Sequence, residues 1–442
     1  MNPLKIAVIG SGIAGLSAAW MLSKNHKVTL YEAGAHLGGH ANTIDVATPE
    51  GNVGVDTGFI VYNERNYPNL VALFAHLGVE TDKTEMSFAL SSNGGAYEYA
   101  GSGLGGFFGQ RRNVARTSHW KLLNDISRFF RTAQQRAAAT SPEIALGTFL
   151  DREGFSPAFI ENHILPMGAA IWSTTMSEML EFPARSFIDF YANHGMLQFQ
   201  NRPQWRSVRG GSRSYVNRLV EDGGFEILLE TGASRIVRHP GYVHVADNRG
   251  ALRPFDHVVV ATHADQALGL LEGPDAAETN LLGSFSYQRN RAVLHRDSRW
   301  MPRRKRLWSS WNYIKKNKGA DTGLCVTYWM NRLQNLQTRT DLFVTLNPYD
   351  AIHPKAVEGE FLYDHPVFDA AAMAAQNDLW TLQGARRTWF CGSYFGYGFH
   401  EDAFQSGLAV GEQLGGACRP WQVDNQSGRI AALNRPRIEA AE

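Results

Sequence analysis

The most constraining feature of this sequence is a glycine-rich turn that follows its first short β-prone run. Lys5–Ile9 is largely apolar, and Gly10-Ser-Gly12-Ile-Ala-Gly15 follows it directly, leading into a helical pattern over Leu16–Ser23. In such a strand–turn–helix unit the first glycine permits the tight turn, the second lets backbone approach a pyrophosphate, and the third allows close helix–sheet packing. The pattern therefore predicts a nucleotide site at a helix N-terminus, where the helix dipole favours an anion.

A second predicted strand narrows the choice of nucleotide. Val28–Tyr31 is β-prone and ends at Glu32, 22 residues after Gly10. A carboxylate at this distance accepts hydrogen bonds from an adenosine ribose and repels a 2′-phosphate, which favours NAD or FAD over NADP. Gly38-Gly39-His40 and the glycine-interrupted run Val53–Ile60 follow. Two glycine-containing segments whose backbone can approach the ligand suggest one that extends beyond the nucleotide, which favours FAD over NAD.

These residues resemble the flavin-dependent amine oxidase and phytoene desaturase superfamily, whose nucleotide signature continues into a Gly-Gly-basic triplet. Two positions depart from it: Asn25-His26 replaces a frequent glycine, and His40 stands where Arg or Lys is usual. The histidine makes the charge near the flavin dependent on pH and weakens a direct equation with amine oxidases. The resemblance implies FAD, which we expect to be non-covalent because Cys391 lies in a predicted buried strand.

The resemblance recurs where the superfamily's FAD domain re-enters the chain. Arg209-Gly-Gly-Ser212 precedes an amphipathic helix, and a β-meander is predicted over Glu226–Leu229, Ala233–Val237 and Tyr242–Ala246. The apolar strand Asp256–Val260 then leads back toward the cofactor. By position, Ala233 is expected to face the adenine.

A strand followed by a helix supplies the last expected flavin contact. Arg387–Tyr394 predicts a strand that runs into Gly392, and Gly398–Ala403 opens a helix that continues to Leu414. The resemblance implies that Gly392 approaches the ribityl-pyrophosphate and that the helix N-terminus points at the flavin N1/C2 carbonyl. A dipole in that place stabilises the anionic reduced flavin and supports hydride acceptance.

Together these segments define the expected cofactor contacts. They are Gly10, Gly12, Ile13, Ala14, Gly15, Glu32, Ala33, Gly38, Gly39, His40, Thr57, Gly58, Phe59, Ile60, Ala233, Thr262, Gly392, Ser393, Asp402 and Ala403.

The expected fold class is α/β, with a Rossmann-like FAD-binding domain of the glutathione-reductase type, amine-oxidase-like, and an inserted α+β substrate domain. The FAD-binding domain is predicted to combine 1–85, 205–270 and 386–420, the substrate and membrane-facing domain 86–204 and 271–385, and a C-terminal tail 421–442.

A narrower resemblance covers most of the chain. Asp56–Asn63, Trp300–Arg304 and Gly398–Asp402 resemble bacterial predicted NAD/FAD-binding oxidoreductases encoded beside cyclopropane-fatty-acid-synthase-like methyltransferases. That group includes desaturases of unsaturated acyl chains in furan fatty acid formation, and the wider superfamily includes polyunsaturated fatty acid isomerases. The resemblance implies an unsaturated fatty acyl or phospholipid substrate and a lipid methyltransferase as a partner.

Composition excludes some partners and directs attention to local charge. With 43 Lys+Arg against 42 Asp+Glu, the chain is not a globally basic nucleic-acid binder. Its three cysteines lack metal-ligand spacing, so we expect no metal and a reduced, cytoplasmic compartment. Residues 101–136 and 289–318 are nevertheless basic and aromatic. This pattern favours peripheral binding to the anionic inner face of the cell membrane, with an ordinary solvated surface as the alternative and nucleic acid as a weaker one.

The candidate catalytic residues lie at the predicted flavin-facing helix. His400 and Glu401, with Tyr394 nearby, are expected to transfer a proton or orient the substrate, although His400 is equally compatible with a structural histidine. Tyr62 and Arg65 are further candidates. An acyl tunnel would use the following apolar residues, for which core packing is the alternative: Leu165–Trp172, Phe182, Phe187, Phe190 and Phe199.

The predicted reaction is desaturation of an unsaturated acyl chain, with oxygen or a membrane quinone as electron acceptor because no second NAD fingerprint follows. The alternatives are a double-bond isomerase, an amine oxidase with an aromatic cage beside the flavin, and a non-catalytic flavin-binding partner of a lipid methyltransferase.

Overall fold

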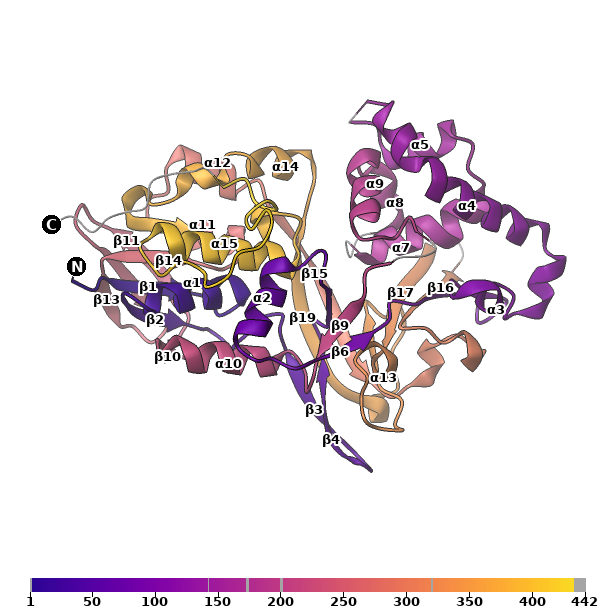
Figure 1. Ribbon diagram of the computed structural model, residues 1–442, viewed down its shortest axis with the longest axis horizontal. Coiled ribbons are helices and arrows are strands. Elements are labelled where there is room, and N and C mark those ends of the chain that lie inside the picture. Colours follow the sequence, from indigo (N-terminus) through magenta and orange to yellow (C-terminus); the bar gives the residue numbers. More distant parts are fainter. Residues whose placement is uncertain (1, 142, 172–174, 199–201, 319–320, 433–442) are drawn as a thin grey trace.

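The computed structural model places two lobes side by side along the long axis of the molecule (Figure 1). One lobe surrounds a parallel sheet, and the other combines a large sheet with a group of helices. The structure describes residues 2–141, 143–171, 175–198, 202–318 and 321–432. Within these ranges, no helix combines the length and the apolar character needed to cross a membrane.

A five-stranded parallel sheet forms the first lobe, in the order β10-β2-β1-β14-β20. The central strands β1 and β14 are buried almost throughout, as expected for parallel strands covered on both faces. Three separate stretches of chain supply the strands, which are β1 (Lys5–Ile9), β2 (Lys27–Tyr31), β10 (Glu226–Leu228), β14 (His257–Val260) and β20 (Thr388–Phe390).

Two helices from opposite ends of the chain pack against each other in this lobe. They are α1 (Ile13–Ser23) and α15 (His400–Gln413). A Cβ on Gly407 of α15 would collide with the carbonyl oxygen of Ala14, so this close approach requires glycine. Because each helix begins at the carboxyl edge of the sheet, the packing brings their N-termini to one place (Figure 1).

The antiparallel meander differs from the sequence prediction in its membership. It consists of β11 (Ala233–Arg238), β12 (Val243–Asp247) and β13 (Leu252–Phe255), whereas the predicted strand Glu226–Leu229 forms β10 of the parallel sheet. Strand β10 follows helix α10 (Arg213–Gly223), which ends at Gly224 in a left-handed conformation. A strand that returns after a helical crossover is placed for parallel pairing, and this explains the difference.

The second lobe is built on a mixed seven-stranded sheet in the order β19-β15-β18-β17-β16-β7-β8. Helices from the first insertion pack on this sheet and share with it one hydrophobic core. The strands are β7 (Phe88–Ser92), β8 (Tyr97–Ala100), β15 (Ser286–His295), β16 (Trp311–Lys318), β17 (Asp321–Trp329), β18 (Phe343–Leu346) and β19 (Val357–Val367). The helices are α4 (Thr117–Ala138), α5 (Leu146–Arg152), α6 (Pro157–Phe159), α7 (Leu165–Ile171), α8 (Met176–Glu181) and α9 (Ala184–Asn193).

Smaller elements complete the two lobes and the region between them. The short strands are β3 (Thr43–Thr48), β4 (Gly51–Asp56), β5 (Val61–Asn63), β6 (Thr81–Thr84) and β9 (Trp205–Val208). Strands β3 and β4 form a hairpin, and β5, β9 and β6 form a three-stranded sheet. The remaining helices are α2 (Pro68–His76), α3 (Gly103–Phe107), α11 (Ala264–Leu270), α12 (Ala276–Leu282), α13 (Met330–Leu333) and α14 (Ala370–Gln376).

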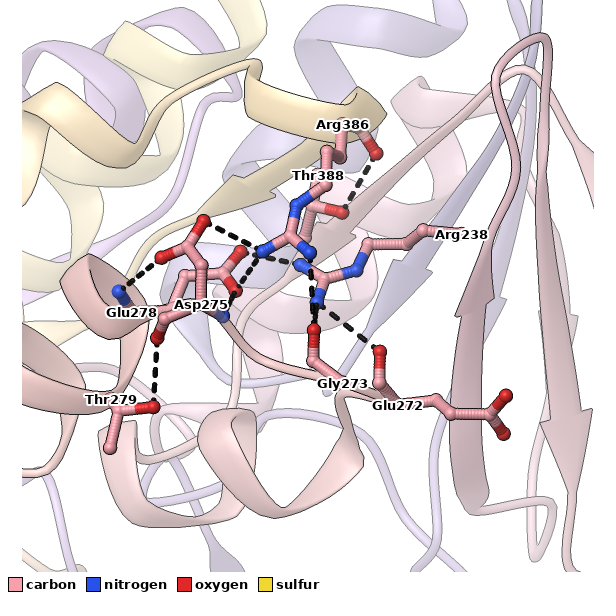
Figure 2. A network of polar contacts seen from close by, with 8 residues as sticks. All are labelled: Arg238, Glu272, Gly273, Asp275, Glu278, Thr279, Arg386 and Thr388. Atoms are coloured by element: carbon pink, nitrogen blue, oxygen red, sulfur yellow. Dashed lines mark hydrogen bonds and ion pairs between the residues drawn. The ribbon is translucent and has the colours of Figure 1, made fainter.

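A buried ion network joins three distant segments of the first lobe (Figure 2). Glu278 of α12, only 2% exposed, accepts from Arg238 at the end of β11 and from Arg386 before β20. Both arginines also donate to the carbonyl oxygen of Gly273. Leu282, Trp380 and their neighbours lie in the core of the same lobe. Residues near 271–285 and 368–385 therefore pack with the nucleotide sheet, although the sequence division assigned them to the substrate domain.

The described part of the predicted C-terminal tail is folded against the first lobe. Trp421 stacks on Trp20 with ring centroids 5.9 Å apart, and Ile430 is buried in the first core. Arg429 forms an ion pair with the fully buried Asp402 of α15. Residues 421–432 thus complete the surroundings of α15.

Candidate functional site

A cavity of about 640 Å³ lies at the carboxyl ends of the parallel strands. Ligands bind at this edge in open α/β sheets. The cavity walls come from the glycine turn, from the ends of β2 and β14, from the start of α15 and from the end of β19. The predicted residues that line it are Gly10, Gly12, Ile13, Ala14, Glu32, Ala33, Gly38, Gly39, His40, Ala233, Thr262, Gly392, Ser393, Tyr394, His400 and Ala403.

The three glycines of the turn have different surroundings. Gly10 has φ +98°, and a Cβ there would lie 2.9 Å from the carbonyl oxygen of Ala261. A Cβ on Gly15 would collide with the carbonyl oxygen of Gly10, so this glycine packs α1 against the turn and does not line the cavity. A Cβ on Gly12 would meet nothing within 4 Å. Gly12 therefore leaves open space at the N-terminus of α1, where a pyrophosphate would bind.

Glu32 lies at the far end of the cavity from α15. Its carboxylate accepts from the backbone N–H of Ser11 at 3.0 Å and from that of Gly34 at 2.7 Å. These bonds fix its orientation beside the glycine turn. The hydroxyl of the neighbouring Tyr31 is buried and has no hydrogen-bond partner among the described residues. Gly232 and Ala233 complete this end of the cavity.

The other end is formed by the start of α15. Gly398 has φ +87°, which turns the chain into the helix, and Asp402 accepts from the N–H groups of Tyr397 and Phe399 at 2.9 and 2.8 Å. Phe399, His400 and Ala403 then line the cavity. Because Gly12, Ile13 and Ala14 line it at the start of α1, two positive helix ends face one space.

His400 is held firmly in this wall. Its Nε2 lies 2.6 Å from the hydroxyl of Tyr215, and its ring stacks on Phe59 with centroids 3.8 Å apart. Burial lowers the pKa of His400 to about 3, so its imidazole is neutral at physiological pH. Tyr394 also lines the cavity, and its buried hydroxyl has no partner among the described residues.

Three further histidines border the same space. His40 lies 5.4 Å from His365 and 6.4 Å from His263 between ring centroids. Burial, with a smaller contribution from adjacent histidines, lowers the pKa of His40 to about 3 and that of His365 to about 4. Among the described lining residues none is Lys or Arg. The carboxylate of Asp364, also in the wall, is paired with Arg289 at 3.0 Å.

Two predicted site residues on α15 have structural roles. Glu401 is fully buried and points away from the cavity, where it accepts from the N–H groups of Asn69 and Leu70 and thereby caps helix α2. Adjacent residues of a helix face directions about 100° apart, so Glu401 and His400 face different neighbours. Asp402 stabilises the turn before α15 and pairs with Arg429. Glu401 is therefore corrected from a catalytic candidate to a helix cap, and Asp402 from a flavin contact to a turn and ion-pair residue.

The predicted segment Thr57–Ile60 forms a layer behind the cavity. The hydroxyl of Thr57 lies 2.6 Å from that of Tyr363, and the N–H of Phe59 donates to the carbonyl oxygen of His40 at 2.7 Å. A Cβ on Gly58 would collide with the same carbonyl oxygen. These two glycine-bearing segments thus approach each other, and the four residues Thr57–Ile60 are not in the cavity wall.

The predicted acyl tunnel and the other substrate residues mostly lie in cores. Leu165 and Phe187 are buried in the second core, and Tyr62 is buried in the first. Phe190 differs, because its ring stacks on Phe399 of the cavity wall at 5.3 Å. Trp172 and Phe199 lie outside the described residues.

The sequence analysis did not identify several lining residues, among them His263, Asp364, His365 and Phe399. Asp364 and His365 come from β19, the edge strand of the seven-stranded sheet. They reach the cavity through long-range strand pairing and carry no local motif. Phe399 belongs to the motif Gly398–Asp402, and its position directly before the predicted helix could have identified it as a lining residue.

The cavity residues fit FAD, a ligand with a nucleotide end, a pyrophosphate and an isoalloxazine ring. Glu32 lines the nucleotide end beside the glycine turn, and Gly12 leaves space at the helix N-terminus for the pyrophosphate. At the opposite end Ser393, Tyr394 and the start of α15 line the cavity. Cys391 is buried outside the lining, and burial raises its pKa.

Fold and site together define an FAD-binding α/β protein. The family profile described as flavin containing amine oxidoreductase matches residues 13–303. The chain belongs to this family, and FAD is its cofactor.

Similar proteins act on different substrates. An L-amino-acid oxidase from Pseudechis australis is 51% identical over 43 residues, which are 10% of this chain and 8% of the oxidase. The chain thus spans less than a tenth of the curated relatives it matches. Among solved structures, a CLA-producing fatty acid isomerase from P. acnes has a TM-score of 0.61 at 14% identity, covering 91% of this chain and 97% of the isomerase. Cyclohexylamine oxidase from Brevibacterium oxydans has a TM-score of 0.63 at 14% identity, covering 93% and 100%. These structures share the fold.

Proposed function

We propose that this FAD-dependent oxidoreductase desaturates an unsaturated fatty acyl chain, free or within a phospholipid. The main support for this proposal is the uncharged cavity wall at the start of α15, which is formed by Tyr394, Phe399 and the neutral His400. A cationic amine would gain from a free carboxylate, but the two acidic groups that line the cavity are already engaged. Glu32 accepts from Ser11 and Gly34, and Asp364 pairs with Arg289. An allylic C–H bond needs no counter-charge in such a wall.

Aromatic residues extend this uncharged wall toward the helical lobe. Phe399 stacks on Phe190 of α9, and His194 packs beside both rings, 3.9 Å from Phe190 and 5.7 Å from Phe399 between centroids. Burial lowers the pKa of His194 to about 4, so this ring is neutral as well. An acyl chain that enters between α9 and the start of α15 would contact apolar and neutral groups.

Desaturation removes two hydrogens from adjacent carbons. FAD, when bound, would supply the two-electron acceptor for the hydride that the allylic carbon loses. The neighbouring carbon loses a proton, and His400 is the cavity group that we assign to accept or relay it. Its contacts with Tyr215 and Phe59 hold the imidazole in one orientation, as a positioned proton acceptor requires. Oxygen or a membrane quinone would then reoxidise the cofactor.

The test is anaerobic mixing of the purified yellow protein with unsaturated fatty acids, phospholipids or amines, followed by flavin absorbance and product mass. We expect loss of flavin absorbance with an unsaturated lipid and a product lighter by two hydrogens. A product of unchanged mass with a moved double bond would assign isomerisation, the reaction named for the P. acnes neighbour. Bleaching by amines alone would refute the lipid proposal, and bound FAD without turnover of any substrate would identify a flavin-binding partner protein.

Variants of the proton-transfer residue separate chemistry from cofactor binding. We expect His400→Ala to slow lipid-driven bleaching by roughly 10²–10⁴-fold, the usual contribution of a general base, while FAD stays bound. Tyr215→Phe removes only the hydroxyl partner of Nε2 and should have a smaller effect. Glu401→Gln is the control on the adjacent residue, because that side chain caps α2. An unchanged rate in His400→Ala would remove its assigned role.

A further inference from the structure

The helical lobe exposes three large apolar side chains within 17 residues of sequence. Leu104 of α3 is 76% exposed, Val114 is 57% exposed and Trp120 of α4 is 52% exposed. These residues form one patch, because the Trp120 Nε1 donates to the carbonyl oxygen of Val114 at 2.9 Å and Phe108 contacts the Trp120 ring at 5.1 Å. The N–H of Phe108 in turn bonds the carbonyl oxygen of Leu104. Exposed apolar side chains gathered in this way mark an interaction site.

Unpaired cations surround the patch. Arg111, Arg112 and Lys121 are exposed, and no carboxylate among the described residues forms an ion pair with them. The sequence from 103 to 124 contains neither Asp nor Glu. We call this surface the α3–α4 tip, defined by Leu104, Arg111, Arg112, Val114, Trp120 and Lys121. It lies at the end of the long axis opposite the parallel sheet, on the right in Figure 1.

We infer that the α3–α4 tip binds the surface of an anionic lipid bilayer. The side chains match the two layers of that surface: the cations meet lipid phosphates, Trp120 suits headgroup depth, and Leu104 and Val114 suit the acyl boundary. Single-stranded nucleic acid is a poorer match, because aliphatic side chains provide no stacking platform for bases. The inference concerns attachment and stands apart from the proposed reaction.

The other basic segment supplies an internal contrast. Eight of its cations are ion-paired with carboxylates: Arg289, Arg291, Arg296, Arg299, Arg304, Lys305, Lys315 and Lys316. Trp300, Trp308 and Tyr313 of the same segment are buried. Arg303 and Arg306 are exposed without such a pair, but no exposed aromatic ring accompanies them among the described residues of this segment. The membrane contact is therefore assigned to the α3–α4 tip.

The experiment measures cosedimentation of the FAD-loaded protein with two kinds of vesicle. One contains saturated phosphatidylcholine only, and the other also contains roughly 30% saturated phosphatidylglycerol, which gives a surface potential close to that of a cytoplasmic leaflet. Saturated chains give no substrate for the proposed desaturation, so binding is read independently of turnover. We expect binding to the anionic vesicles that weakens with salt, and much weaker binding to the zwitterionic ones. Absence of binding to both vesicles would overturn the inference.

Two variants test the two parts of the tip. Replacing Arg111, Arg112 and Lys121 together by Gln should weaken anionic binding by roughly a hundredfold. Leu104→Ser with Trp120→Ser should weaken binding at all salt concentrations. The matched control is Leu362→Ser, because Leu362 is 63% exposed on β19, away from the tip. Equal loss in the control, wild-type binding by both tip variants, or tighter binding to single-stranded DNA or to a protein partner at matched salt would overturn the inference.

Discussion

Residues 101–136 and 289–318 are alike in composition and opposite in structure. Both are basic and rich in aromatic residues, yet the first presents free cations and exposed apolar side chains, whereas the second buries Trp300, Trp308 and Tyr313 and pairs most of its charges. The difference follows from neighbours. In the second segment β15 pairs with β19, which places Asp364 directly opposite Arg289. The α3–α4 tip is formed by the short helix α3, the turn over Arg111–Ala115 and the start of α4, none of which pairs with a strand. Composition alone therefore does not distinguish a membrane surface from a charged sheet.

The largest expected effect is the loss of a buried ring from segment 289–318. Trp308 packs against Trp329 and Phe343, and its Nε1 donates to the carbonyl oxygen of Pro302 at 2.7 Å. We expect Trp308→Ala to lower the free energy of unfolding by about 3–5 kcal/mol, because it leaves a cavity and an unpaired carbonyl. Denaturant unfolding measures this loss. A change below about 1 kcal/mol would contradict the buried assignment.

Next comes the ion pair between Arg304 and Glu98. Glu98 is completely buried, and its carboxylate lies 2.6 Å from the Arg304 guanidinium. Arg304→Met should destabilise the fold by about 3–5 kcal/mol, since it strands a buried charge. Arg303→Met is the matched control, because the adjacent Arg303 is exposed. If both variants unfold at the same denaturant concentration, the Arg304–Glu98 pair does not stabilise the fold, and the contrast between the two segments loses this support.

The second segment should also be the more acid-sensitive one. His295 is fully buried, its Nδ1 accepts from the N–H of Asp297, and burial lowers its pKa to about 4. Because this value lies below the unfolded value of about 6.5, its stabilising contribution is complete above that pH and is lost as pH falls toward 4. Between pH 7 and 5 the loss should be about 2 kcal/mol.

The measurement is denaturant unfolding at pH 7 and at pH 5, compared between the wild type and His295→Gln. The variant should lose about 2 kcal/mol less stability on acidification than the wild type does. His36→Gln, at an exposed position, serves as the control and should keep the wild-type pH dependence. Equal pH dependence in all three proteins would show that His295 takes up its proton without unfolding.

The smallest expected effect belongs to the α3–α4 tip. Trp120→Ala should change the free energy of unfolding by less than about 0.5 kcal/mol, in contrast to Trp308→Ala, because half of the Trp120 ring is already in solvent. The same denaturant titration measures both. A large loss in Trp120→Ala would mean that the ring supports the helical lobe and would remove the distinction between the two tryptophans.

Local motifs in the sequence predicted much of the nucleotide lobe. The remaining site residues depend on contacts between segments that are distant in sequence, and these could not be predicted. Gly10 and Gly15 serve backbone constraints within a few residues, so their positions are readable from the chain. Whether His400 or Glu401 faces the cavity depends on the rotation of α15, which is fixed by tertiary packing. His365 enters through the edge of a sheet whose strands are distant in sequence. Such contacts have no local sequence signal.

The order of strands in the parallel sheet has a consequence for truncated variants. The cavity needs Gly10, Thr262 and His400, which are far apart in sequence, and Arg429 secures the turn before α15. A variant cut before α15 lacks one wall of the cavity, although its glycine turn is intact. Such a truncation should yield colourless protein.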